Sequence, residues 1–167
     1  MGKVKRIAFL GLMQALILIL AVLEHMLPPL PFMPPGVRIG LANVVVMYVL
    51  FFVGGKEAFA LNIVKSGFVF LTRGAVAAAL SFSGGVLSLC VLLLLVKLAK
   101  ARASYIMLSV ASAIAHNIGQ MLVFMVITRT PAIVYYLPFL LIFGVILGII
   151  TGVILKILFN KIRGGYL

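Results

Sequence analysis

The residues that could do chemistry stand inside long apolar runs, where a polar side chain is the exception. Lys65 carries the most information, because placing a cation near the middle of a bilayer costs roughly 2.5–3.5 kcal/mol on insertion scales. On a helix, Asn62, Lys65 and Arg73 share one face. A polar stripe of this kind faces a cavity or the interior of a bundle. Two interpretations of Lys65 stay open: it meets an anionic or carbonyl-rich ligand, or it bonds to carbonyl groups of neighbouring helices.

A second polar stripe lies in the run 105–127. Its members share about 140° of a helical surface and are Ser109, Ser112, His116, Asn117 and Gln120. The last three offer donors and acceptors without fixed charge, which suits recognition of the polar edge of a small molecule. The alternative is hydrogen bonding between helices, which we favour for the two serines.

Glu24, His25, Arg38 and Asn43 gather where the first two apolar runs approach each other. An ion pair between Glu24 and Arg38 is one explanation of this cluster. In the other, Arg38 or Arg73 attracts an anionic ligand at the mouth of a cavity. We therefore place Arg38, Asn43 and Arg73 among the candidate substrate-binding residues.

The composition decides the class of protein. Of 167 residues 65% are apolar and 10% charged, with fourteen Lys and Arg against two acids, Glu24 and Glu57. A soluble domain needs a larger charged surface, so the chain is an integral membrane protein. Without Asp, and with two isolated Glu, no paired-carboxylate site or acidic metal cage forms. We expect no catalytic residue, no metal and no cofactor. The basic residues punctuate apolar runs, which argues against nucleic acid as a partner.

We predict an all-α protein forming a single membrane domain over residues 1–167, with six transmembrane helices. The spans cover about 7–27, 39–53, 58–71, 82–96, 105–127 and 137–159. Residues 28–37 are rich in proline, which forbids helix, and are predicted to form an external loop. Residues 75–80 either extend the fourth span or form a re-entrant segment, so the boundary between the third and fourth spans stays open.

The distribution of basic residues predicts the orientation. With six spans and both termini in the cytoplasm, the cytoplasmic side carries Lys3, Lys5, Arg6, Lys56, Lys97, Lys100, Arg102, Lys156, Lys161 and Arg163. The outer side carries only Arg38, Arg73 and Arg129. This asymmetry follows the positive-inside rule for a multi-pass protein of a bacterial-type cytoplasmic membrane, the cell membrane.

Small residues mark surfaces where helices can approach closely. Ala8, Gly11 and Ala15 form such a strip on the first predicted helix. A strip of this kind packs inside its own bundle or, where it faces outward, receives a partner. The chain has no Walker A motif, so active transport would draw its energy from an ion gradient or from a partner.

Residues 34–43, PPGVRIGLAN, and residues 115–120, AHNIGQ, resemble the Gx transporter family over nearly the whole chain. Members of this family are often labelled heptaprenyl diphosphate synthase component I. The family is similar to the S components of energy-coupling factor (ECF) transporters, which are six-helix membrane proteins. The resemblance implies docking through small residues of the first helix onto a coupling subunit with two cytoplasmic ATPases. It also implies a site in the outer half of the membrane, roofed by the loop after the first span.

The function expected from this resemblance is that of a substrate-binding subunit for a small vitamin-like molecule, with flavins as the suggested class. The alternative is a non-catalytic membrane subunit of a heptaprenyl diphosphate synthase system, or a transporter of an isoprenoid or quinone precursor. Trans-prenyltransferases bind diphosphate through aspartate-rich magnesium sites, and this chain has no Asp, so we do not expect an enzyme. A stand-alone carrier would show pH dependence centred on His116 or Glu24.

Overall fold

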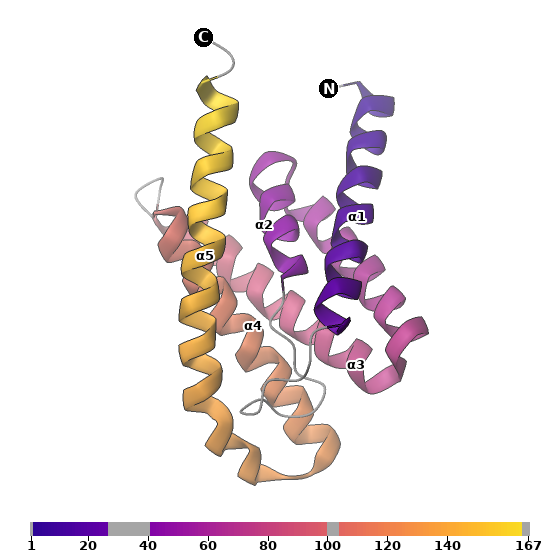
Figure 1. The fold of residues 1–167 in the computed structure, drawn as a ribbon, viewed down its shortest axis with the longest axis vertical. Coiled ribbons are helices and arrows are strands. Elements are labelled where there is room, and N and C mark those ends of the chain that lie inside the picture. Colours follow the sequence, from indigo (N-terminus) through magenta and orange to yellow (C-terminus); the bar gives the residue numbers. More distant parts are fainter. Residues whose placement is uncertain (1, 27–40, 100–103, 165–167) are drawn as a thin grey trace.

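The computed structural model describes residues 2–26, 41–99 and 104–164, and all its regular elements are helices. In chain order they are α1 (Lys3–Met26), α2 (Ala42–Phe52), α3 (Gly55–Ala99), α4 (Tyr105–Thr128), the 3-10 helix η1 (Pro131–Tyr136) and α5 (Leu137–Gly164) (Figure 1). The prediction of an all-helical protein is therefore confirmed. The predicted proline-rich loop, residues 28–37, lies outside the described residues.

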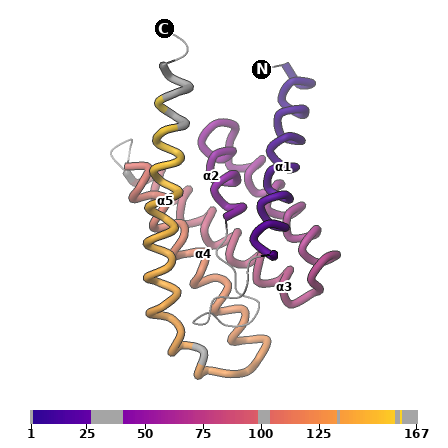
Figure 2. The backbone as a smooth tube through the Cα atoms, viewed as in Figure 1, coloured from indigo at the N-terminus to yellow at the C-terminus, as the bar shows by residue number. Residues whose placement is uncertain are grey.

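The prediction of six separate helices is wrong for the described residues, which form five α-helices. The third and fourth predicted spans, 58–71 and 82–96, both belong to α3. Residues 75–80 continue the helix, and the chain changes direction at Gly74, whose φ of 84° and ψ of 177° are not helical. Only glycine adopts this conformation readily. One glycine thus bends α3 into two arms, which meet at the lower right side of the molecule in the view of Figure 2.

Four helices are long and apolar enough to cross a membrane by length and composition: Lys3–Met26, Gly55–Leu98, Tyr105–Thr128 and Val134–Ile157. The 11 residues of α2 make a helix of only about 17 Å, which is shorter than the hydrocarbon core of a bilayer. Helix α2 falls within the predicted span 39–53, and α1 begins four residues before the predicted span 7–27.

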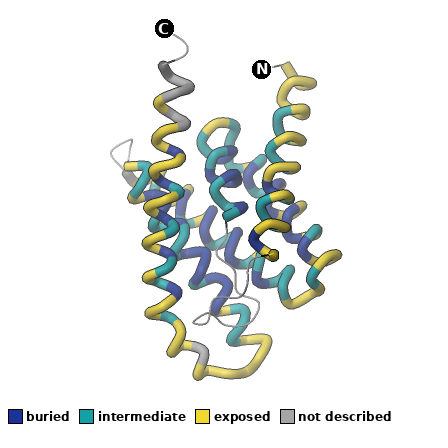
Figure 3. Tube along the Cα trace, viewed as in Figure 1, coloured by how far each residue is buried: buried dark blue, intermediate teal, exposed yellow. Residues whose placement is uncertain are grey.

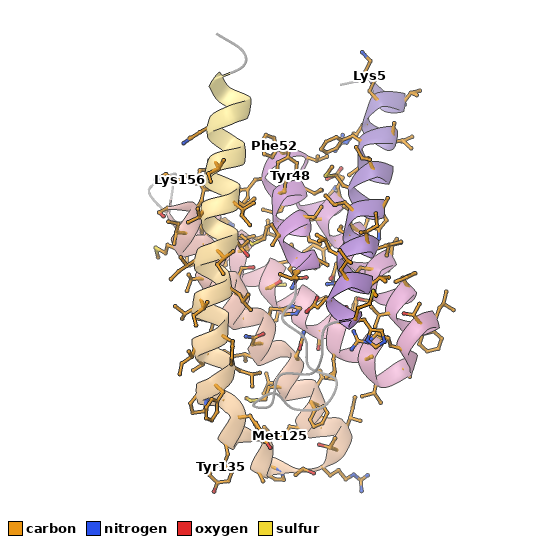
Figure 4. The ribbon with its side chains drawn as sticks, in the orientation of Figure 1. Lys5, Tyr48, Phe52, Met125, Tyr135 and Lys156 are labelled. Carbon is orange, nitrogen blue, oxygen red and sulfur yellow. The ribbon has the colours of Figure 1, made fainter. Side chains whose placement is uncertain are left out.

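Both chain termini lie at the same end of the bundle (Figure 1). Lys5 and Lys156 mark the half of the molecule nearer to that end, whereas Met125 and Tyr135 lie at the opposite end (Figure 4). The turn between α4 and η1, which carries Arg129, is also at the opposite end.

Close backbone packing joins α4 to α5. A Cβ atom added to Gly148 would lie 2.5 Å from Cα of Val110, and one added to Gly152 would lie 2.5 Å from Cα of Ile106. The glycines of α5 therefore face the inside of the bundle, where they let the two helices touch. The outward faces of α1 and α5 carry many exposed apolar side chains (Figure 3), as expected of surfaces that contact lipid.

Gly74→Ala should lower the free energy of unfolding by about 1–3 kcal/mol, because alanine is strained at this backbone conformation. Gly67→Ala is the matched control. It lies in the same helix, and an added Cβ meets nothing within 4 Å at either position. Since Gly67 is helical, alanine there should preserve or raise stability. Thermal unfolding in detergent measures both, and equal stability of the two variants would contradict the assigned role of Gly74.

Candidate functional site

Lys65 is held inside the bundle by the first turn of α2. Its side chain is buried, with 4% of the residue exposed, and Nζ donates a hydrogen bond of 2.7 Å to Oδ1 of Asn43. Asn43 is the second residue of α2, and Lys65 lies in the middle of the first arm of α3. Two predicted binding residues from different helices thus meet. Their contact explains how the polar head of Lys65 is satisfied away from water.

Glu24 supplies the negative charge near Lys65. It is buried near the end of α1 and interacts electrostatically with the Lys65 ammonium. The predicted partner of Glu24 was Arg38, which lies outside the described residues. Glu24 was not among the predicted binding residues. Its rarity as one of two acids in the sequence was the signal that could have identified it.

His116 and Gln120 form a second polar pair, on α4. Their side chains, one helical turn apart, hydrogen bond through Nε2 of each residue at 2.5 Å. Nδ1 of His116 is buried without a well-formed hydrogen bond to any residue that the structure describes. It faces the backbone of Gly84, where a Cβ atom would lie only 2.7 Å from it. The absence of a side chain at Gly84 therefore lets the imidazole enter the contact between α3 and α4.

Two cavities meet at His116. The one that we call the charged cavity has a volume of about 40 Å³. Its polar lining consists of Glu24, Lys65, Arg73, Ser81, His116 and Gln120. The other, which we call the serine cavity, has about 30 Å³ and is lined in part by Asn43, Ser109, Ser112 and His116. Each has room for ordered water. Neither admits a molecule of the size of a flavin as it stands.

The two predicted asparagines of α3 and α4 contact other helical segments and do not line either cavity. Asn117 donates a hydrogen bond of 2.8 Å from Nδ2 to the carbonyl oxygen of Leu140 on α5. Asn62 is fully buried against the backbone of Gly85, and neither atom of its amide has a hydrogen-bond partner among the described residues. The geometry thus gives Asn117 a packing role and leaves Asn62 with unused hydrogen-bonding capacity.

Arg73 and the two predicted serines of α4 also line the cavities. Arg73 is partly buried at the end of the first arm of α3, just before Gly74, and lines the charged cavity. Ser109 is buried, with its hydroxyl 4.0 Å from Sδ of Met47 on α2. Ser112 is likewise buried beside the serine cavity.

The small-residue strip of α1 faces outward. Ala8, Gly11 and Ala15 are all exposed, and a Cβ atom added to Gly11 would meet no described residue within 4 Å. This differs from α5, where Gly148 and Gly152 touch the backbone of α4. At its N-terminal end, α1 is tied to the start of α3 by an ion pair between Arg6 and Glu57. The strip therefore lies on the exposed side of α1, away from the other described helices.

The arrangement is suited to binding. An ammonium, a guanidinium and a carboxylate surround a small space, with an imidazole and an amide on the neighbouring wall. These groups come from α1, α3 and α4, while α2 positions Lys65 through Asn43. Such a set can fix the orientation of a polar molecule through charge and hydrogen bonds.

Comparison with known proteins gives one family. The family model described as heptaprenyl diphosphate synthase component I matches residues 13–158. No curated protein and no solved structure matches the chain. The matched residues include every residue that lines the two cavities.

Asn117→Ala should destabilise the protein more than Asn62→Ala, because of the two side-chain amides only that of Asn117 makes a hydrogen bond among the described residues. Both changes remove the same atoms from buried positions. The free energies of unfolding of the two variants should therefore differ by the contribution of one interhelical hydrogen bond in a membrane. That contribution is about 0.6 kcal/mol and at most about 1.7 kcal/mol. Thermal unfolding of the two variants in the same detergent measures it. A larger loss for Asn62→Ala would mean that its amide has a partner in the purified protein.

Proposed function

The chain belongs to the heptaprenyl diphosphate synthase component I family, and we propose that it is the substrate-binding membrane subunit of an ECF-type transporter. In this proposal it acts as an S component that captures a small vitamin-like molecule, with flavins as the candidate class. The observation that carries the proposal is the buried group of Glu24, Lys65, His116 and Gln120 around a cavity inside an apolar bundle.

The free-energy cost of burying these polar side chains in a membrane domain supports a binding role. Charged side chains inside a membrane domain are expensive and commonly mark the path or site of a substrate. Here Lys65 and Glu24 are both buried although the surrounding helices are largely apolar. A purely structural bundle of this size would be served by apolar side chains at these positions.

Binding a molecule of the size of a flavin requires the site to enlarge. The charged cavity and the serine cavity share the side chain of His116, so a movement of this imidazole joins them into one space. Gln120 and the serines then offer hydrogen bonds to the polar edge of a heterocycle such as a flavin, and Lys65 and Arg73 offer charge. Asn43, which lines the serine cavity and accepts the hydrogen bond of Lys65, completes the proposed site. Asn62 lines neither cavity and is kept in the proposal as the sequence predicts. Arg38, outside the described residues, is kept in it as the sequence predicts.

The proposed membrane topology has six crossings, in the cell membrane, with both termini in the cytoplasm. In this proposal the second crossing is the predicted span 39–53, of which the short helix α2 forms a part. Residues 55–73 and 75–99 of α3 form helical arms of about 28 and 37 Å, so each arm approaches or exceeds the hydrocarbon thickness. The shared position of the two termini supports this topology (Figure 1).

The exposed strip Ala8, Gly11 and Ala15 is the proposed docking surface for the coupling subunit, which would bring two cytoplasmic ATPases. A flat strip of small residues allows the backbones of two helices to approach closely in a membrane. The word component in the family description also fits a protein that works with another subunit.

A second candidate function follows from the family description itself: a non-catalytic membrane subunit of a heptaprenyl diphosphate synthase system. Transport of an isoprenoid or quinone precursor is a related possibility. Prenyl synthase activity that depends on adding this chain to a purified catalytic subunit would favour the second candidate. Copurification with ATPase subunits would favour the first.

Gly11→Leu should reduce copurification of the coupling subunit by about tenfold or more, which corresponds to about 1.4 kcal/mol, because leucine fills the surface on which the partner helix rests. Gly67→Leu is the control, since Gly67 is also exposed and has nothing within 4 Å of an added Cβ. Quantitative mass spectrometry of tagged protein measures the partner. Undiminished recovery with Gly11→Leu would remove this surface from the proposal.

Gln120→Ala should lower the amount of small molecule that the gently purified protein retains, because it removes an amide that lines the charged cavity. Native mass spectrometry compares the retained mass with that of the wild type. Thr128→Ala is the control on the same helix, since its exposed hydroxyl only bonds the carbonyl oxygen of Phe124. Equal retention by all three proteins would place the ligand elsewhere.

A further inference from the structure

The serines and threonines inside the described helices fall into two groups, according to where their hydroxyls bond. Five of the hydroxyls donate to a carbonyl oxygen three or four residues earlier in the same helix, which is a common way to satisfy a hydroxyl in an apolar helix. They belong to Ser66, Thr72, Ser83, Ser88 and Thr128. None of these five residues lines the charged cavity or the serine cavity.

The other four hydroxyls do not bond to their own helix, and all four residues line a cavity. Ser81 lines the charged cavity, whereas Ser109, Ser112 and Thr151 line the serine cavity. The hydroxyl of Ser109 lies 4.0 Å from Sδ of Met47, which is a weak acceptor. The hydroxyls of Ser112 and Thr151 bond to no residue that the structure describes. The bonds between helices that the sequence favours for the two serines are therefore not formed by Ser112 within the described part of the chain.

The serine cavity is uncharged and rich in hydrogen-bond donors. The described residues that line it include no Lys, Arg, Asp or Glu. Oδ1 of Asn43 already accepts the hydrogen bond from Lys65, so the amide of Asn43 offers another molecule only the N–H groups of Nδ2. Three hydroxyls and one amide can thus donate into a space that also has apolar walls, among them Val44 and Leu147.

A buried hydroxyl without a hydrogen bond is unfavourable. Ser112 is in this position, because only 3% of the residue is exposed and its hydroxyl has no partner in the described helices. The volume of about 30 Å³ has room for one water molecule or for one oxygen atom of a larger molecule. The acceptor that completes this cavity is therefore a group that the described helices do not supply.

We infer that the serine cavity receives one uncharged carbonyl oxygen of the ligand, and that Ser112 and Thr151 donate the hydrogen bonds that select it. This inference rests on the proposed function and names the chemistry by which its ligand is recognised. A carbonyl oxygen only accepts hydrogen bonds, which suits a lining of donors, and it brings no charge into a cavity without a counter-charge. The ring of a flavin and the ring of a quinone both carry such an oxygen, so they are two sources of the same chemistry.

The test measures thermal unfolding of the purified protein in nanodiscs with two uncharged probes, riboflavin and duroquinone. Duroquinone is a fully methylated quinone, which limits its reaction with the exposed thiol of Cys90. Durene, a methylated ring without oxygen, is the control for partitioning into the lipid. The proteins are the wild type, Ser112→Ala, Thr151→Val and the control Ser88→Ala. The control removes a buried hydroxyl that bonds only within its own helix.

A carbonyl probe should raise the unfolding temperature of the wild type and of Ser88→Ala, whereas durene should not. The apparent affinity should weaken about two- to tenfold in Ser112→Ala and in Thr151→Val, as expected for the loss of one hydrogen bond. A response to riboflavin supports the inference with a flavin ring as the source, and a response to duroquinone alone supports it with a quinone. Equal affinity of all four proteins for the probe that binds, or binding of neither carbonyl probe, overturns it and leaves the cavity to ordered water.

The two single variants are independent arms, so the inference stays testable if one of them does not fold. Without a probe, neither should lower the unfolding temperature by more than Ser88→Ala does, because the hydroxyls that they remove have no partner in the described helices. A larger loss in both would mean that these hydroxyls are structural and would overturn the inference. The proposed function is scored separately: a molecule lost in Gln120→Ala but retained by Ser112→Ala and Thr151→Val would keep the binding subunit and remove only this part of its site.

Discussion

The hydrogen bond between Lys65 and Asn43 is the constraint on which the interior of this protein depends. It brings the first turn of the short helix α2 against the middle of α3 and holds an ammonium group out of water. Glu24 of α1 adds an electrostatic interaction with the same group. Three helices are therefore arranged around one cation, and the cavity beside it is lined by charged groups in an otherwise apolar bundle.

Glycine decides how the other walls of the site are built. Gly74 turns α3 back on itself, so that the second arm returns beside α4. Gly84 then admits the ring of His116, and Gly85 admits the amide of Asn62. The imidazole of His116 and the amide of Asn62 can occupy these positions because the glycines that face them have no Cβ atom. The proposed binding site is thus as much a product of backbone approach as of the polar residues themselves.

Small residues line one side of both α1 and α5, but the two strips have different surroundings in the structure. The glycines of α5 contact the backbone of α4, whereas Ala8, Gly11 and Ala15 of α1 are exposed. The spacing of small residues along a helix shows that such a strip exists, but it does not show which neighbouring helix contacts it. The same limit applies to Asn117, whose position beside His116 gave no indication that it bonds to α5.

The sequence by itself determined the membrane class, the helical fold and the positions of most helices, because hydrophobicity and helical periodicity are local properties of the chain. It also predicted that the side chains of Lys65, His116 and Gln120 face the interior of the bundle, because a polar residue in an apolar run is unfavourable against lipid. Only the tertiary structure decided that α3 is one bent helix and that Glu24 lies near Lys65. Those features depend on a single backbone conformation and on contacts between residues far apart in the chain, which no local pattern encodes.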